Sequence, residues 1–368
     1  MAEPQYNRRD DRGGLRFLVT AACLVIVIAG LRAGATVLVP FALALFLAVL
    51  SLPLILLLRR FRIPAFLAIL FTLLVNVAII SVFVMIITRS VTELVAAMPR
   101  YAEQFEALAV ESVAWLQGWG IPVSAAVITD MIDPARVIDL VTGALRGIAA
   151  VLTSAFLVLL IMIFILGEAT VFPKKLRIIL GSEDADISRY SKIITEVQNY
   201  LTIKTLVSLA TGTTVGVSMW LVGLDFPVLW GLLAFLFNYI PNVGSILAAI
   251  PAVLLALIQL GFGSALLVAG IYAGVNVVFG NLVEPNLLGR RLGLSTLVVV
   301  LSLVFWGWVW GPIGMLLSVP LTMIVKIMLE NSREFRWVAV LLAGSKSDDL
   351  LTPPEDPLLR EVPEEQPL

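Results

Sequence analysis

The fold is decided by the stretch from Phe226 to Val283, which reads FPVLWGLLAFLFNYIPNVGSILAAIPAVLLALIQLGFGSALLVAGIYAGVNVVFGNLV and contains no charged residue. A charged cluster, EPNLLGRR, follows from Glu284 to Arg291, and a second uncharged stretch runs from Leu292 to Val325. A membrane-spanning helix needs about 20 predominantly apolar residues. Two such long stretches in one half of a chain predict a polytopic membrane protein.

The composition supports this prediction. Hydrophobic residues make up 60% of the chain and charged residues 14%, with a mean hydropathy of +1.02. Soluble domains have about 45–50% apolar and about 25% charged residues. The single Cys23 excludes an intrachain disulfide, and the chain has no histidine, the commonest general base and metal ligand. With no phosphate-binding loop or catalytic triad either, we expect no enzyme, no metal site, no cofactor and no nucleic-acid partner.

Proline and glycine interrupt both uncharged stretches. The first break is Asn238 to Gly244 (NYIPNVG) and the second is Trp306 to Gly314 (WGWVWGPIG). A proline inside a helix frees a backbone carbonyl, and such groups are tolerated at membrane depth only when buried in protein or facing a water-filled cavity. Interrupted hydrophobic segments in corresponding positions indicate a transporter binding site. The alternative is that both breaks are kinks in structural helices.

Basic residues predict the topology through the positive-inside rule. The 58 residues from Phe226 to Val283 suffice for two full spans, or for one re-entrant hairpin and one span. Only the hairpin places Arg290 and Arg291 in the cytoplasm, so we expect a hairpin here and a second one, of opposite orientation, after it. VGSILAAIP, which ends at Pro251, is echoed by IGMLLSVP, which ends at Pro320, and this echo suggests an inverted repeat.

The predicted fold is therefore an all-α polytopic membrane protein with about eight transmembrane segments, two of them Pro/Gly-broken re-entrant hairpins. The predicted regions are a basic cytoplasmic N-terminus (1–16), three scaffold spans (17–88), external amphipathic helices broken at Pro99, Pro122 and Pro134 (89–146), a fourth span (147–167), a cytoplasmic amphipathic connector (168–204), a transport unit of span, hairpin, span and hairpin (205–330), and a cytoplasmic tail (331–368) that is disordered from about residue 345.

Amide, proline and glycine residues at the breaks form the candidate site. Amides both donate and accept hydrogen bonds, which suits a neutral polyhydroxylated solute, although hydrogen bonds between helices are an equal alternative. Glu284 borders an uncharged run and is a functional candidate on that ground, unless it merely pairs with Arg290 or Arg291. The predicted substrate-binding residues are Asn238, Pro241, Asn242, Gly244, Asn281, Glu284, Pro312 and Gly314; Glu284 and Asp225 are the candidates for ion coupling, and Arg290, Arg291, Pro251 and Pro320 have structural or topological roles.

Three motifs carry a family resemblance: Asn238-Tyr239-Ile240-Pro241 through Pro251, Glu284-Pro285 through Ser295, and Phe305 through Pro320. On these motifs the chain resembles the autoinducer-2 exporter family of PerM-like permeases, particularly its TqsA-like branch, from about Phe17 to Val340. The resemblance implies export of a small, neutral, hydroxyl-rich signalling molecule across a bacterial inner membrane.

The resemblance also implies a homo-oligomer embedded in the lipid bilayer, and we expect both termini in the cytoplasm. Because the family includes members described as sodium/proton antiporters, that activity is the alternative, and a non-transporting structural membrane protein is the third reading.

Overall fold

The computed structural model describes residues 11–118, 143, 155–169, 171, 175, 184–241, 243–288, 294–330 and 336–343. Within these residues every element is helical, and the one β-type contact is an isolated bridge between Leu294 and Ala343. The predicted all-α fold is confirmed. Several residues named above lie outside the described ranges: Asn242, Arg290, Arg291, Pro122, Pro134 and the tail after residue 343.

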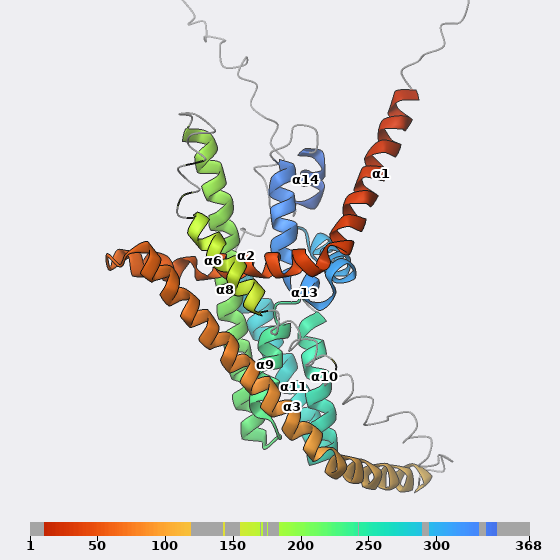
Figure 1. Ribbon diagram of the computed structural model, residues 1–368. Helices are drawn as coiled ribbons and strands as arrows, with labels where there is room; N and C mark the ends of the chain where they lie inside the picture. Colours follow the sequence, from red (N-terminus) through yellow and green to blue (C-terminus); the bar gives the residue numbers. More distant parts are fainter. Residues whose placement is uncertain are drawn as a thin grey trace, which may run out of the picture.

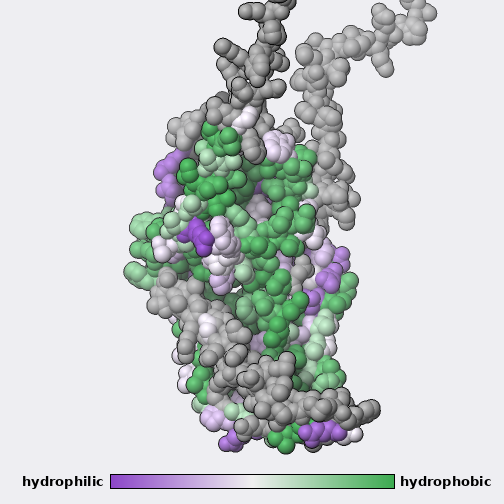
Figure 2. Space-filling model, turned by 90° about the vertical axis from the view of Figure 1, so that its right-hand side faces the viewer, coloured by the Kyte–Doolittle hydropathy of each residue, from purple (hydrophilic) through white to green (hydrophobic). Residues whose placement is uncertain are grey.

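Six described helices are long and apolar enough to cross a membrane. They cover Ala35–Arg60, Ala65–Ala97, Thr195–Val222, Val243–Leu260, Phe262–Leu287 and Thr296–Glu330, and three shorter apolar helices cover Leu18–Ala33, Ala155–Ala169 and Pro227–Phe237. The surface agrees with a membrane location, because Figure 2 shows hydrophobic residues covering much of one face of the molecule. The predicted number of about eight segments stays a prediction.

The N-terminal helices meet the rest of the molecule at about mid-height in Figure 1. Helix α1 (Asp11–Ala33) projects from the body, α2 (Ala35–Arg60) crosses it, and α6 (Ala155–Ala169) packs on α2. Small residues allow this close packing: Ala44 and Ala48 of α2 lie buried in one cluster with Met162 of α6.

Helix α3 (Ala65–Gly118) is longer than the sequence predicts. Pro99 lies inside the helix, where the sequence predicts a break, and Figure 1 shows the ribbon bending near this point and continuing in a new direction. Proline removes only one intrahelical hydrogen bond, so a helix bends there when the residues on both sides favour helix.

Helix α8 (Asp184–Val222) is also continuous across a predicted boundary. The sequence predicts a cytoplasmic connector up to Lys204 and a span from Thr205, but both belong to one helix. Its C-terminal half packs closely on α9 (Pro227–Phe237), because Gly212 and Gly231 face each other across the contact. A Cβ atom on Gly212 would lie 2.6 Å from the Gly231 carbonyl oxygen, so the two helices can pack this closely only because both residues lack a side chain.

At the first break the chain leaves α9 after Phe237 and enters α10 (Val243–Leu260) through a short turn. Gly244 makes this turn possible. A Cβ atom there would lie 1.8 Å from the carbonyl oxygen of Phe237, so no other residue fits. Helix α11 (Phe262–Val275) then packs against α10 and continues through η1 (Asn276–Val283) into α12 (Glu284–Leu288).

At the second break α13 (Thr296–Glu330) folds back on itself. Gly311 has φ 66° and ψ −148°, a conformation that favours glycine. The Trp306 indole donates a hydrogen bond to the Thr322 hydroxyl at 3.0 Å, although 16 residues of straight helix would separate them by about 24 Å. The short helix α14 (Arg336–Leu342) packs on α13.

Both breaks therefore use the same construction. A Cβ atom on Gly314 would lie 1.9 Å from the carbonyl oxygen of Trp306, as one on Gly244 would from that of Phe237. Pro251 and Pro320 follow inside the second arm of each turn. This structural match agrees with the sequence echo. The position of either turn relative to a bilayer stays a prediction.

Candidate functional site

The candidate site is built around a buried ion pair between Lys204 of α8 and Glu284 of α12. The Lys204 Nζ atom lies 2.6 Å from Oε1 and 2.8 Å from Oε2 of Glu284. The two side chains are only 3% and 17% exposed. A charge is very costly in an apolar interior unless it is paired, so each residue makes the other tolerable there.

Glu284 is positioned by the π-helix η1, which ends immediately before it. A π-helix has i→i+5 hydrogen bonds, is rarely longer than one turn, and is found frequently at functional sites. Here it joins α11 to α12 within an apolar segment of 26 residues, Phe262–Leu287. The irregular backbone therefore carries the carboxylate towards α8.

Polar residues continue along the same face of α8. Tyr200, Lys204, Ser208 and Thr211 are buried and spaced four, four and three residues apart, the spacing of one helical face. Asn238, just after α9, donates a hydrogen bond to the Ser208 hydroxyl at 2.9 Å. The next residue, Tyr239, donates a hydrogen bond from its hydroxyl to the hydroxyl of Thr205 at 2.8 Å. Thr205 lies about one helical turn before Ser208 on α8.

Two buried hydroxyl oxygens in this region have no hydrogen-bond partner among the described residues. They belong to Thr211, at the end of the polar face of α8, and to Tyr272 of α11, a helix that packs against α8. Buried polar atoms are normally paired, so an unpaired one needs an explanation, such as a ligand that it binds. Hydroxyl and amide groups together suit an uncharged, hydroxyl-rich molecule.

The structure brings together two of the predicted binding residues, Asn238 and Glu284. They lie on different elements, but both contact the polar face of α8, at Ser208 and Lys204, one helical turn apart. Pro241 lies in the first turn, and Asn281 is exposed on η1. Pro312 and Gly314 lie at the second turn, where the neighbouring Trp310 donates a hydrogen bond to the Leu31 carbonyl of α1.

Gly244 and Gly314 have a clear structural role at these turns. Each lies against the carbonyl group of the preceding helical arm. Close backbone packing alone therefore accounts for both glycines, and a role in binding substrate stays a prediction.

Asp225, the second coupling candidate, lies just beyond the C-terminal end of α8, whereas Glu284 contacts the middle of this helix. Val222 follows Lys204 by 18 residues, a rise of about 27 Å. The Asp225 carboxylate pairs with Arg100 and accepts a hydrogen bond from Tyr101 at 2.6 Å. Burial, followed by this hydrogen bond, raises the pKa of Tyr101 to about 12. Through these two interactions Asp225 connects the loop between α8 and α9 to the bend of α3.

Sequence reasoning missed Lys204. Its position next to a basic segment suggests a cytoplasmic connector, and its partner is 80 residues away in the sequence. One signal was present: Lys204 continues without a break into the polar series Thr205, Ser208 and Thr211 at helical spacing. Glu284 therefore has a salt bridge to a cation that the sequence did not suggest. Because Arg290 and Arg291 lie outside the described residues, pairing of Glu284 with either of them stays a prediction.

Within the described part of the chain, no group of three or more His, Cys, Asp or Glu side chains is placed to hold a metal ion.

Comparison with known proteins agrees with a transport role. Residues 21–334 of this chain match the family of AI-2E family transporters. The AI-2 transport protein TqsA of Escherichia coli is 40% identical over 330 residues, covering 90% of this chain and 96% of TqsA. A relative from Haemophilus influenzae is 37% identical over 333 residues, covering 89% of this chain and 96% of its own, and E. coli YhhT is 33% identical over 336 residues, covering 91% and 96%. With its apolar spans and this match over most of its length, the chain belongs to the AI-2E family of membrane transporters.

Proposed function

We propose that this transporter exports autoinducer-2 or a closely similar neutral, hydroxyl-rich signalling molecule across the bacterial inner membrane. The observation that carries the proposal is the buried polar face of α8, on which Asn238 and the Lys204–Glu284 pair converge within a membrane-spanning segment. TqsA, 40% identical, is an AI-2 transport protein. No name among the relatives above indicates a sodium/proton antiporter.

The solute binds, in this proposal, between the polar face of α8 and the first turn, at Asn238 and Asn242. The unpaired hydroxyls of Thr211 and Tyr272 hydrogen-bond to it. The ion pair keeps Glu284 neutralised, so the site carries no net charge and favours an uncharged solute. Transport follows alternating access, in which the two broken segments, 226–283 and 292–325, move relative to the scaffold helices.

Three further expectations belong to this proposal. The N- and C-termini lie in the cytoplasm, because basic residues flank the first two spans. Both turns are re-entrant hairpins of opposite orientation. The protein works as a homo-oligomer, with the segment between Pro99 and Pro134 in the contact region.

The test is uptake of autoinducer-2 into inside-out membrane vesicles containing the protein. Thr211→Val is the informative variant, because it removes only an unpaired buried hydroxyl and therefore should not destabilise the fold. We expect transport to fall about three- to tenfold, the value of one net hydrogen bond. Thr213→Val, on the exposed side of the same helix, should transport at the wild-type rate.

Two results would refute the proposal. If protein-containing vesicles accumulate no more autoinducer-2 than empty vesicles, the substrate is wrong. If the substrate is transported and Thr211→Val behaves like Thr213→Val, the site is wrong.

A further inference from the structure

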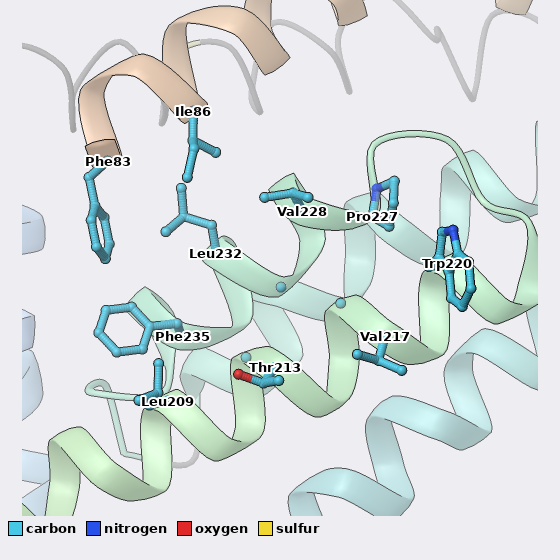
Figure 3. A pocket seen from close by; sticks show the side chains of 13 residues that line it. Phe83, Ile86, Leu209, Thr213, Val217, Trp220, Pro227, Val228, Leu232 and Phe235 are labelled. Carbon is cyan, nitrogen blue, oxygen red and sulfur yellow. The ribbon is translucent and has the colours of Figure 1, made fainter. Parts of the chain in front are cut away.

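A long apolar groove lies on the outside of α8, away from the polar face (Figure 3). Its volume is about 460 Å³, and helices α3, α8 and α9 supply its walls. Phe83 and Phe235 face each other at one end and Trp220 lies at the other. Gly212, Gly216 and Gly231 lie at its floor, where the backbones of α8 and α9 pack closely against each other.

A polar pocket adjoins the groove. It has a volume of about 500 Å³ and contains Ser90, Glu93, Arg100 and Asp225. Pro227 and Val228 line both cavities, so the groove and the pocket adjoin at these two residues.

The two cavities match the depth profile of a membrane. The apolar spans of α3 and α8 end at Ala97 and Val222, which places the polar pocket at the membrane surface. From Leu209 to Trp220 the groove follows about 16 Å of α8. Half of a hydrocarbon core about 30 Å thick is about 15 Å, so the groove has the length of one leaflet. Trp220 is exposed near the polar end, as tryptophan commonly is at membrane interfaces.

The charges of the polar pocket select the head group. Arg100 contributes one positive charge, whereas Glu93 and Asp225 contribute two negative charges, so the pocket carries a net charge of −1. An anionic head group would be repelled. A zwitterionic one places its phosphate near Arg100 and its cation near Glu93. A primary ammonium donates hydrogen bonds to Glu93, but a trimethylated choline has no N–H to donate.

We propose that α3, α8 and α9 bind one phospholipid with an ethanolamine head group, its acyl chain in the groove and its head group in the polar pocket. A helix of a second copy would fill the apolar groove but would leave the Glu93 carboxylate without a cation, because Arg100 already pairs with Asp225. The adjacency of the two cavities and the charge of Glu93 therefore favour the lipid.

Native mass spectrometry of the purified full-length protein in detergent tests this assignment. Phosphatidylethanolamine, phosphatidylcholine and phosphatidylglycerol with identical acyl chains are added at equal concentration. We expect the ethanolamine lipid to bind about three- to tenfold more than the choline lipid, as one charge-assisted hydrogen bond in a partly exposed site allows. Glu93→Gln should abolish this preference. Glu103→Gln, an exposed glutamate on the same helix outside the pocket, should retain it.

A second substitution tests the groove itself. Val217→Trp fills it and should reduce adducts of all three lipids, whereas Leu221→Trp, exposed on the same helix outside the groove, should not. Equal binding of the ethanolamine and choline lipids by the wild type would overturn the proposal, as would equal behaviour of the two glutamine variants. If Val217→Trp dissociates an oligomer and leaves the lipid adducts intact, the groove belongs to a second copy. Glu93 is exposed, so its substitution tests the head group even where the tryptophan variant fails to fold.

Discussion

The Lys204–Glu284 pair provides the sharpest test of the fold, because the same protein contains an exposed pair for comparison. Lys175 and Glu168 are also 2.6 Å apart, but their side chains are 56% and 55% exposed. In the buried pair the side chains are 3% and 17% exposed. The two pairs therefore differ chiefly in burial. Substituting each lysine by methionine and comparing the two losses of stability shows how strongly burial raises the cost of removing the cation.

Lys204→Met leaves the Glu284 carboxylate in an apolar interior without its cation. Removing one partner of a buried pair costs about 3–5 kcal/mol, and the partial exposure of Glu284 favours the lower end, about 3 kcal/mol. Lys175→Met should cost less than about 1 kcal/mol, because exposed pairs contribute little. The double variant Lys204→Met/Glu284→Gln removes both charges and should recover most of the loss, since a neutral side chain has a much smaller desolvation cost.

The assay is equilibrium unfolding of the purified protein in mixed micelles with increasing denaturing detergent. Expected stabilities rank the wild type and Lys175→Met together, the double variant next, and Lys204→Met last. The reasoning fails if Lys204→Met is as stable as Lys175→Met, or if the double variant is less stable than Lys204→Met alone.

Three further predictions concern other parts of the molecule. Gly244→Ala and Gly314→Ala should each prevent folding, because the new Cβ atom would overlap a carbonyl oxygen. The control Gly270→Ala, with open space around the new atom, should fold normally. Fluorescence-detected size-exclusion chromatography of the three variants checks this. Asp225→Asn should weaken the attachment of the α3 bend only slightly, because the Arg100 and Asp225 side chains are 58% and 36% exposed, and limited proteolysis near residue 100 would detect the change. A loss of stability as large as that of Lys204→Met would contradict this view. The pKa of Tyr101 is raised from 10 to about 12, so its contribution to stability is complete below about pH 10 and is lost as the pH rises through about 12. The stability advantage of the wild type over Tyr101→Phe should therefore be constant up to about pH 10 and then shrink. An advantage that does not change with pH would contradict this prediction.

The sequence predicts the elements whose signals are local. Long uncharged stretches predict the spans, because each span must satisfy its own backbone and bury few charges. Pro241, Gly244, Gly311 and Pro312 predict the two breaks, and the structure has a chain reversal at each. Pro99 shows the limit of such local signals: it predicts an end, but the helix bends and continues to Gly118.

The site depends on contacts that no local pattern encodes. Asn238 and Glu284 could be chosen from the sequence because each interrupts or borders an apolar stretch. Their meeting point could not, because it lies on α8, 30 and 80 residues earlier in the chain. A lysine in a basic neighbourhood predicts a cytoplasmic surface, and only the packing of the π-helix against α8 shows that Lys204 is buried.

The two carboxylates that the sequence treats as equal coupling candidates are separated by their surroundings. The Asp225 carboxylate, which is 36% exposed, pairs with Arg100, which is 58% exposed, so water reaches this pair directly. Glu284 is held by a cation that is almost completely buried, and it sits directly after an irregular π-helix. Any event that separates Glu284 from Lys204 must supply a replacement partner to each charge or allow water to enter. A coupling role for Glu284 therefore requires its separation from Lys204, and water or a new partner must then reach a lysine side chain that is only 3% exposed.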